Sequence, residues 1–351
     1  MPAENLVPLF RVKINGADIP PQAAADLITA TVHEDVDAPG MFALQLINYD
    51  MGRLEVTWSD DTLFNEGNAV DIKMGYVDNL TTIFKGDITG LEQEFNSDEV
   101  PTLTVRGYDR RYRLLRGSKT RSFTQMKDSD IARKIAGEQG LTAKVENSKV
   151  NLDYVLQHNQ SDMDFLQERA RRIGYEVVVE DKTLYFRPRQ NTAKKALTLR
   201  SMGLIEFYLR STLLNQLSQV EVRGWDSKKK SEIIGKADKG KIATAMGGST
   251  TGPAAADSAF GKAAGASVNY PVFNQAEADQ IALGGINETA LAYITGEGLT
   301  IGRTDLRAGT VIRIEGLGKR NSGLYYVTST THTYTPARGY RTRFSVRRNA
   351  A

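Results

Sequence analysis

Apolar and polar side chains alternate in short runs over the first hundred residues. Leu44 and Leu46 fall on a period of two, which is the spacing of a strand with one buried face. Comparable runs are separated by Gly, Asn, Asp and Pro at turn positions, and they cover residues 30–33, 42–47, 69–74 and 102–106. Several strands at this spacing favour a barrel or a sandwich, and we predict a first β-domain over residues 1–115.

The pattern changes to helical spacing within residues 116–190. The triplet Asp128–Asp130 precedes an apolar i, i+4 pair, Ile131 and Ile135, and Gly140 follows. This order of residues predicts a helix with a polar N-cap and a terminal glycine.

A second helix is expected over about residues 161–173. Ser161 and Asp164 form a variant of the capping box, and Gly174 ends the apolar stripe. The residues at 175–186 then predict a β-hairpin. We interpret this middle region as a small α+β domain.

Strands return in residues 191–351, where we predict the second β-domain. Residues 226–272 interrupt it with six Lys between positions 228 and 241 and then a tract of Ala, Gly, Ser and Thr. Such a composition buries too little apolar surface to offset chain entropy, so it predicts a flexible loop. Asn274 and Glu277 predict the capped start of a helix over about 275–292. Further strands are expected at 217–223, 310–314, 324–329 and 340–346.

The two β regions show a weak internal sequence similarity. Residues 67–72 read Gly-Asn-Ala-Val-Asp-Ile, and residues 309–314 read Gly-Thr-Val-Ile-Arg-Ile. Either the chain holds two similar β-domains, or unrelated β-meanders share this pattern. The predicted fold class is mixed and mainly β, with two β-barrel domains and a small α+β domain between them.

Composition excludes several classes of protein. Apolar residues are 40% and charged residues 25% of the 351 positions, as in ordinary globular proteins. No run of 18 apolar residues occurs, and the N-terminal stretch lacks a basic region followed by an apolar one, so neither a membrane-spanning helix nor a secretory signal is expected. With no cysteine, the chain has no disulfide, no thiolate metal site and no cysteine nucleophile.

The formal net charge of +3 hides a strong asymmetry along the chain. Residues 1–100 carry 5 Lys+Arg and 18 Asp+Glu, a net −13. Residues 101–190 carry 18 and 12, a net +6, and residues 191–351 carry 22 and 12, a net +10. Surfaces of opposite charge could pair between copies of the chain or between neighbours in a stack, or they could be solvated faces without a partner.

The sequence contains few groups suited to catalysis. Its three histidines, His33, His158 and His332, are far apart, and a zinc site would need them to converge with carboxylates. The motifs GxSxG, HExxH and GxxxxGK[ST] are absent. Residues 316–323 contain three glycines between two predicted strands, which indicates a hairpin turn, because a phosphate loop needs a following helix. We therefore expect no catalytic, cofactor-binding or metal-binding residues and no cofactor.

Two other function classes stay open. The basic run of residues 106–121, with Tyr108 and Tyr112 among its cations, could bind phosphates and stack bases in a nucleic-acid-binding assembly protein. The same run also suits a solvated or subunit-facing surface. The many carboxylates of residues 1–100 would allow a cell-wall hydrolase, although no two of them are singled out by spacing.

Several stretches resemble one known family. The most specific is the segment at 157–166, which continues through 172–175 to 184–188, and others lie at 65–76, 83–89, 105–109, 222–226 and 322–327. They resemble the phage late control gene D proteins, the central hub of contractile tails, whose fold also forms the hub part of valine-glycine repeat proteins in type VI secretion. The resemblance spans most of residues 50–350, except 226–272. The matching motif residues, for which the resemblance implies a structural role, are Gly67, Gly75, Tyr76, Phe84, Gly86, Gly107, Asp109, Asp164, Phe165, Leu166, Gly174, Tyr175, Gly224, Trp225, Asp226, Gly323 and Tyr326.

The resemblance implies a homotrimeric baseplate hub that is not an enzyme. Two tail-tube-like barrels per chain would form a ring that adapts a six-fold tube to a three-fold spike. The implied partners are further copies of the chain, the tail tube protein, a separate spike protein and other baseplate proteins. No small-molecule substrate is expected, and nucleic acid is not an expected partner.

The sequence ends shortly after the last predicted barrel strand, so no fused lysozyme or spike is expected. The protein would be made in the bacterial cytoplasm. It would then become a virion component of a phage tail, or part of a tailocin or another contractile injection system.

Overall fold

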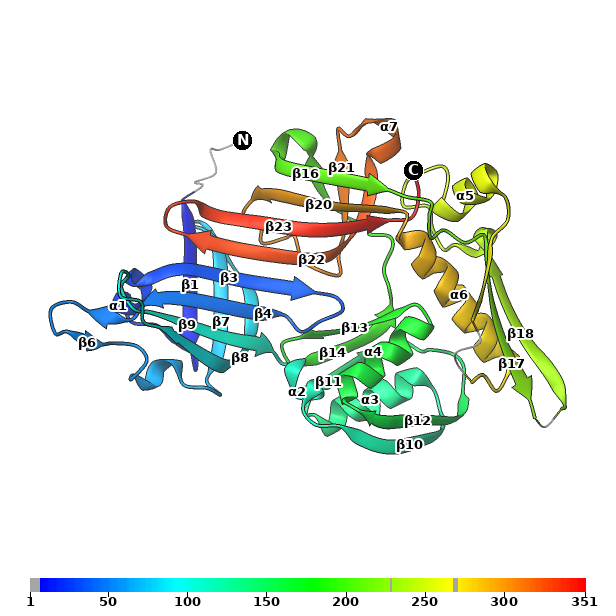
Figure 1. Ribbon diagram of the computed structural model, residues 1–351, viewed down its shortest axis with the longest axis horizontal. Helices are drawn as coiled ribbons and strands as arrows, with labels where there is room; N and C mark the ends of the chain where they lie inside the picture. Colours follow the sequence, from blue (N-terminus) through cyan, green and yellow to red (C-terminus); the bar gives the residue numbers. More distant parts are fainter. Residues whose placement is uncertain (1–6, 228, 268–270) are drawn as a thin grey trace. The chain divides into compact units, whose positions relative to one another are not determined.

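Strands dominate the computed structural model, which describes residues 7–227, 229–267 and 271–351 (Figure 1). The prediction of a mixed, mainly β fold is confirmed. The chain divides into two units, and strands β20 (Ile294–Ile301), β22 (Gly323–Thr335) and β23 (Gly339–Arg348) contribute residues to both. Unit 1 contains the residues up to Tyr112 with 299–308 and 329–344, and unit 2 contains 113–298, 309–328 and 345–351.

In unit 1, antiparallel strands pair in the order β22-β3-β4-β9-β8-β7-β1-β2. The strands from the first part of the chain are β1 (Pro8–Ile14), β2 (Ala17–Asp18), β3 (Leu27–Asp35), β4 (Met41–Ile47), β7 (Ala69–Tyr76), β8 (Asn79–Glu94) and β9 (Thr102–Asp109). Shorter elements lie between them: α1 (Pro21–Ala25), β5 (Tyr49–Asp50), β6 (Glu55–Val56) and the 3-10 helix η1 (Thr62–Phe64).

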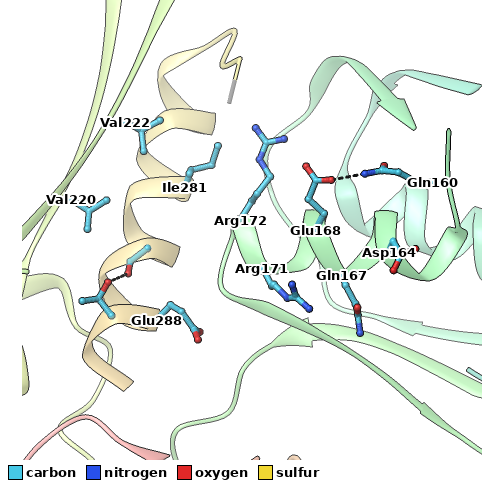
Figure 2. Close-up of a pocket in the computed structure, with 12 residues that line it drawn as sticks. Gln160, Asp164, Gln167, Glu168, Arg171, Arg172, Val220, Val222, Ile281 and Glu288 are labelled. Carbon is cyan, nitrogen blue, oxygen red and sulfur yellow. Dashed lines mark hydrogen bonds between the residues drawn. The ribbon is translucent and has the colours of Figure 1, made fainter. Parts of the chain in front are cut away.

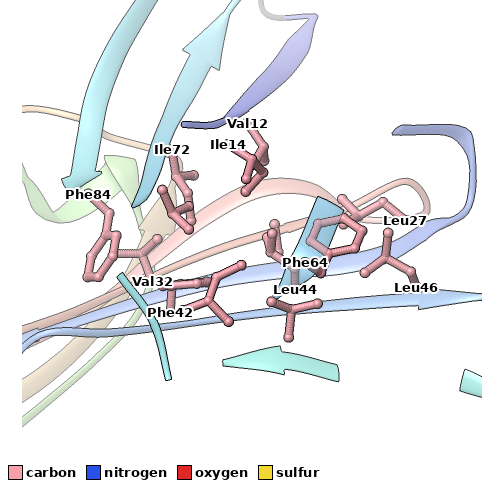
Figure 3. Packing of buried hydrophobic residues seen from close by; sticks show 14 of the residues in the cluster. Val12, Ile14, Leu27, Val32, Phe42, Leu44, Leu46, Phe64, Ile72 and Phe84 are labelled. Atoms are coloured by element: carbon pink, nitrogen blue, oxygen red, sulfur yellow. The ribbon is translucent and has the colours of Figure 1, made fainter. Parts of the chain in front are cut away.

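The alternation in the sequence explains the core of unit 1. Phe42, Leu44 and Leu46 of β4 are all buried, and they pack with Ile72 of β7 and Phe64 of η1 (Figure 3). Because alternate side chains of a strand point to one face, each strand contributes half of its residues to this cluster. The predicted period of two is therefore confirmed in β4 and β7.

The α+β part of unit 2 contains the two predicted helices and the predicted hairpin, together with strands β10, β11 and β12, which were not predicted. Helices α3 (Asp128–Glu138) and α4 (Asp162–Arg172) bury Ile131, Ile135 and Phe165 against small sheets. Strand β10 pairs with β12, and β14 pairs with both β11 and β13. Their bounds are β10 (Lys119–Met126), β11 (Thr142–Val145), β12 (Leu152–Gln160), β13 (Tyr175–Glu180) and β14 (Thr183–Pro188), and α2 (Tyr112–Leu115) precedes them.

The remaining elements of unit 2 follow in the chain. Strand β21 pairs with β15 and β22, and the order β16-β20-β23 continues the sheet. The predicted hairpin around residues 316–323 is present as β21 and β22, joined through one turn of helix. The bounds are β15 (Leu197–Arg200), η2 (Ser201–Gly203), β16 (Leu204–Ser211), β17 (Gln219–Asp226), β18 (Ser231–Asp238), η3 (Lys239–Lys241), α5 (Gly252–Phe260), β19 (Ala264–Ser267), α6 (Gln275–Leu291), β21 (Val311–Glu315) and α7 (Gly318–Asn321).

The prediction of a loop without regular structure over 226–272 is wrong for its described part. That part forms strand β18, helix α5 and strand β19, with β17 between β18 and β19 in a three-stranded sheet. Ile233, Ala237 and Val272 are buried against α6, and for the two residues of β18 this surface lies far away in sequence. Lys228 and residues 268–270 lie outside the described residues.

The strands of the two β regions were expected to close into barrels. Over the described residues, the pairings form an open path in each unit, and no closed barrel is found. Long strands explain the difference: β22 pairs with β21 through residues 323–326 and with β3 through residues 329–334, so it serves both regions. None of the helices in the described ranges is long and apolar enough to cross a membrane.

Candidate functional site

The three histidines do not form a metal site. His33 lies on β3 opposite Thr331 and His332 lies on β22 opposite Val32, while His158 lies on β12 in the other unit. No group of three His, Cys, Asp or Glu side chains that could hold a metal ion occurs in the described part of the chain.

A buried polar cluster in unit 1 surrounds His332. Arg307 donates from Nε to Oε2 of Glu34 at 2.8 Å, and Nδ1 of His332 lies 2.7 Å from the hydroxyl of Tyr340. Burial lowers the pKa of His332 to about 4, so the imidazole is neutral near pH 7. Burial acts to raise the pKa of Glu34, but hydrogen bonds and the charge of Arg307 hold it below its ordinary value overall. The cluster ties residues 299–308 to β3 and has the features of a structural contact.

The basic run of residues 106–121 is largely occupied by partners from the same chain. Arg106 pairs with Glu92 at 2.8 Å, and the buried Arg111 donates to Asp109 at 2.9 Å and to the Asp35 carbonyl at 2.8 Å. Cations that already pair with carboxylates of the same chain are poor ligands for phosphates, since binding would have to break these contacts. The structure thus gives the nucleic-acid alternative little support at this run.

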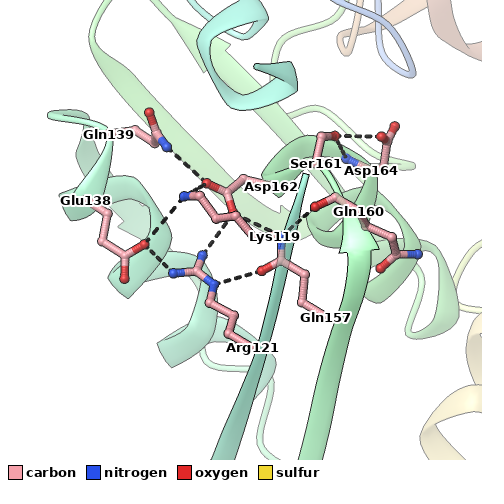
Figure 4. A network of polar contacts seen from close by, with 9 residues as sticks. All are labelled: Lys119, Arg121, Glu138, Gln139, Gln157, Gln160, Ser161, Asp162 and Asp164. Atoms are coloured by element: carbon pink, nitrogen blue, oxygen red, sulfur yellow. Dashed lines mark hydrogen bonds and ion pairs between the residues drawn. The ribbon is translucent and has the colours of Figure 1, made fainter. Parts of the chain in front are cut away.

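The last two cations of that run belong to a network around Asp162, the first residue of α4 (Figure 4). Lys119 Nζ lies 2.6 Å from Oδ2 of Asp162, and Arg121 Nη2 lies 2.9 Å from Oδ1. Gln157 and Gln139 also donate to this carboxylate, at 3.1 Å and 3.0 Å. Burial acts to raise the pKa of Asp162, but these donors lower it overall, so the carboxylate stays charged and fixes the start of α4 against β10 and β12.

The predicted N-cap of α3 is wrong in detail. The helix begins at Asp128, after Lys127 as N-cap, and no side chain caps it. The Asp128 carboxylate instead accepts two hydrogen bonds from Arg169 of α4, at 2.6 Å and 3.2 Å, and both side chains are buried. A buried guanidinium without a carboxylate partner destabilises a protein more than a helix start without a capping side chain does.

The predicted caps of the two later helices are confirmed. The Asp164 N–H donates to Oγ of Ser161 at 3.1 Å, as the variant capping box requires. The Glu277 N–H donates to Oδ1 of Asn274 at 2.9 Å, and the Glu277 carboxylate accepts from the Phe273 N–H.

A groove in unit 2 lies between α4, α6 and β17 (Figure 2). It encloses about 610 Å³. Val220, Val222 and Ile281 form its apolar side, and charged residues of α4 face them. Glu168 accepts from Gln160 at 2.9 Å, and Glu288 pairs with Arg347 at 3.2 Å. Both carboxylates therefore have side-chain partners within the same unit, an arrangement that does not favour acid–base chemistry.

The structure brings the motif residues of unit 1 together on β7, β8 and β9. A Cβ on Gly107 would lie 2.1 Å from the Asp87 carbonyl oxygen and 2.3 Å from the Phe42 ring, so this position has room only for glycine. Asp109 accepts from the Gly40 N–H at 2.7 Å, and Gly86 is its register partner. The others share this sheet or the turn before it: Gly67, Gly75, Tyr76 and Phe84.

The motif residues of unit 2 fall into three separate groups. Asp164, Phe165 and Leu166 lie in the first turns of α4, and Gly174 and Tyr175 follow its end. A second group, Gly224, Trp225 and Asp226, ends β17. The third, Gly323 and Tyr326, lies on β22, and the Tyr326 hydroxyl donates to Oε2 of Glu176 at 2.5 Å.

Several contacts that hold these regions had no signal in the sequence. Glu34 and Arg307 are 273 positions apart, and Glu176 and Tyr326 are 150 positions apart. Neither pair has a local spacing that would indicate it. Only an excess of charged residues within strand patterns could have suggested buried ion pairs.

Comparisons with known proteins give one family match and a group of similar solved structures. A family model described as the Alg8 N-terminal domain matches residues 4–336. No curated protein sequence matches the chain. Among solved structures, the 43 kDa tail protein of prophage MuSo2 from Shewanella oneidensis is 13% identical, with a TM-score of 0.71, and the match covers 97% of this chain and 98% of that one.

Two further structures have the same fold. The tail protein from Neisseria meningitidis MC58 is 12% identical, with a TM-score of 0.68, and the match covers 97% of this chain and 96% of that one. The E. coli c3393 protein, a component of the type VI secretion system, is 14% identical with a TM-score of 0.60, over 97% and 77% of the two chains. The fold of the chain is therefore that of phage tail and type VI secretion proteins.

Proposed function

The chain belongs to the family described as the Alg8 N-terminal domain, and we propose that it is the structural baseplate hub of a contractile phage tail, tailocin or injection system. The observation that carries this proposal is the fold, which corresponds to that of a prophage tail protein over almost the full length of both chains. The finer resemblance to the late control gene D proteins, which rests on the motif residues, is part of the same proposal.

In this proposal the hub is a homotrimer that joins a six-fold tube to a three-fold spike. We divide the chain into a first tube-like domain at 1–115, an α+β domain at 116–190 and a second tube-like domain at 191–351. Three copies with two β-domains each would present six similar edges to the tube protein and three to a separate spike.

The proposed work of the hub is load bearing, without catalysis. This is supported by the many buried ion pairs and hydrogen bonds that hold distant segments, such as Arg169 with Asp128 and Tyr326 with Glu176. Buried polar contacts of this kind hold the two segments in one relative position, because moving one partner away leaves the other as a buried charge without a counter-charge.

Particles that carry an epitope tag on this chain test the proposal. Antibody label should appear at one end of the tube, at its junction with the spike. Label along the whole tube, or particles that assemble fully without the chain, would contradict a hub function.

A further inference from the structure

The hairpin of β17 and β18 exposes an aromatic side chain beside a group of cations. Its inner face is buried, since Val222 and Ile233 pack with α6. Its outer face carries Trp225, which is 58% exposed and lies opposite Glu232. An exposed tryptophan on a strand whose other face is fully packed has no partner in the core of its own unit, and such residues often anchor protein interfaces.

The same hairpin is basic at its tip. Residues 223–236 contain five Lys or Arg and two Asp or Glu. Lys229 and Lys230 are exposed at the turn, and Arg223 and Lys236 share the single carboxylate of Glu221, each at 3.0 Å. We call residues 223–236 the basic hairpin.

A second hairpin in unit 1 has the opposite charge. Residues 90–101, where β8 turns into β9, contain four Asp or Glu and no Lys or Arg. Phe95 at the turn is 60% exposed and Val100 beside it is 45% exposed. Of the four carboxylates, Glu92 pairs with Arg106 at the base of the turn. We call residues 86–109 the acidic hairpin.

We propose that the basic hairpin of one protomer docks on the acidic hairpin of a second copy of the chain. The tip of each hairpin has an exposed aromatic residue as an anchor, and the two tips have charges of opposite sign. Because every copy carries one hairpin of each kind, the contact runs head to tail and can close into a ring. The inference rests on the proposed trimer and assigns one of its contacts.

Cross-linking between two differently tagged copies tests the contact, because the chain has no cysteine of its own. One copy carries Asn96→Cys at the acidic turn and the other carries Ser227→Cys at the basic turn, so both aromatic anchors stay intact. A short bis-maleimide should link the two copies. The matched control is Val77→Cys, which is exposed at the opposite end of β8 and should give no link to Ser227→Cys.

Charge reversal shows whether complementarity forms the contact. Lys229→Glu with Lys230→Glu should lower the yield of cross-linked chains at least about fivefold. Adding Glu94→Lys and Glu99→Lys to the other copy should restore it. A reversal that changes nothing would overturn the inference.

Mass measurement of the same samples separates this inference from the proposed function. Trimers without any cross-link between positions 96 and 227 would overturn the docking contact and leave the trimer intact. Monomers without a cross-link would overturn both. Binding of a duplex DNA probe that the Lys229→Glu and Lys230→Glu changes abolish, with no cross-link between copies, would identify nucleic acid as the occupant instead and overturn the proposal.

Discussion

The hydroxyl of Tyr326 on β22 and the carboxylate of Glu176 on β13 form a buried hydrogen bond of 2.5 Å. Tyr326→Phe should destabilise the protein by about 1–3 kcal/mol, because the carboxylate loses a donor that water cannot replace. Urea unfolding followed by tryptophan fluorescence measures this change. Tyr208→Phe is the matched control, since Tyr208 is exposed on β16, and it should leave the midpoint unchanged. Equal effects of the two changes would contradict a structural role for this contact.

The lowered pKa of His332 predicts that the protein becomes less stable as the pH falls. Burial holds the pKa of the folded imidazole at about 4, below the ordinary 6.5, so the unfolded chain binds a proton more readily than the folded chain between these values. The neutral His332 side chain makes its full contribution to the free energy of unfolding above pH 6.5. About 3 kcal/mol of that free energy is lost as the pH falls toward 4. Glu34, whose pKa is also lowered, adds a further loss as the pH falls through its folded pKa.

Urea unfolding at several pH values between 7 and 4.5 measures this loss. His332→Gln should make the slope of unfolding free energy against pH shallower in that window. Tyr340→Phe should lower stability but keep the wild-type slope, because the imidazole stays buried. A slope that is the same with and without His332 would show that its proton uptake does not govern acid sensitivity.

At the scale of elements, the close approach of β18 to α6 depends on Gly235. A Cβ at this position would lie 2.2 Å from the carbonyl carbon of Ala278, within the backbone of the helix. Gly235→Ala should therefore destabilise unit 2 by about 1–3 kcal/mol, since the strand must move away from the helix. Gly90→Ala on β8 has nothing within 4 Å and is the control. Thermal unfolding compares the two, and equal midpoints would mean that the hairpin does not need this packing.

Elements with local signals could be predicted from the sequence. The period of two in β4 and the caps at Ser161 and Asn274 depend on residues within a few positions of one another, so the pattern is complete in the local sequence. The fold class followed from these elements.

Elements that depend on distant partners could not be predicted. Strand β18 forms in a segment rich in Lys, Ala and Gly because residues of α6 from Ala278 onward, which lie far away in sequence, cover Ile233 and Ala237. The capping residue of α3 was misassigned for a related reason, since Asp128 pairs with Arg169 on another helix. The pairing of β22 with both β21 and β3 likewise has no signal in either local pattern.

At the scale of the whole molecule, the charge asymmetry should affect assembly more than final stability. In the proposed assembly, the −13 of residues 1–100 and the +10 of residues 191–351 would attract one another between copies at long range. Salt at molar concentration screens such attraction beyond about 3 Å, and exposed pairs contribute only about 0–1 kcal/mol each. Stopped-flow light scattering should show slower assembly as salt rises, while preassembled particles stay intact. An assembly rate that does not change with salt concentration, or that rises with it, would mean that the charges do not guide assembly.

The central claim is that the chain is a hub made of three copies. Light scattering coupled to size exclusion measures the mass of the purified protein without assuming its shape. The account predicts a particle of about 116 kDa, three times the 38.7 kDa of one chain. A mass of one chain that persists at the highest soluble concentration, and a single copy per particle in the assembled tail, would contradict it.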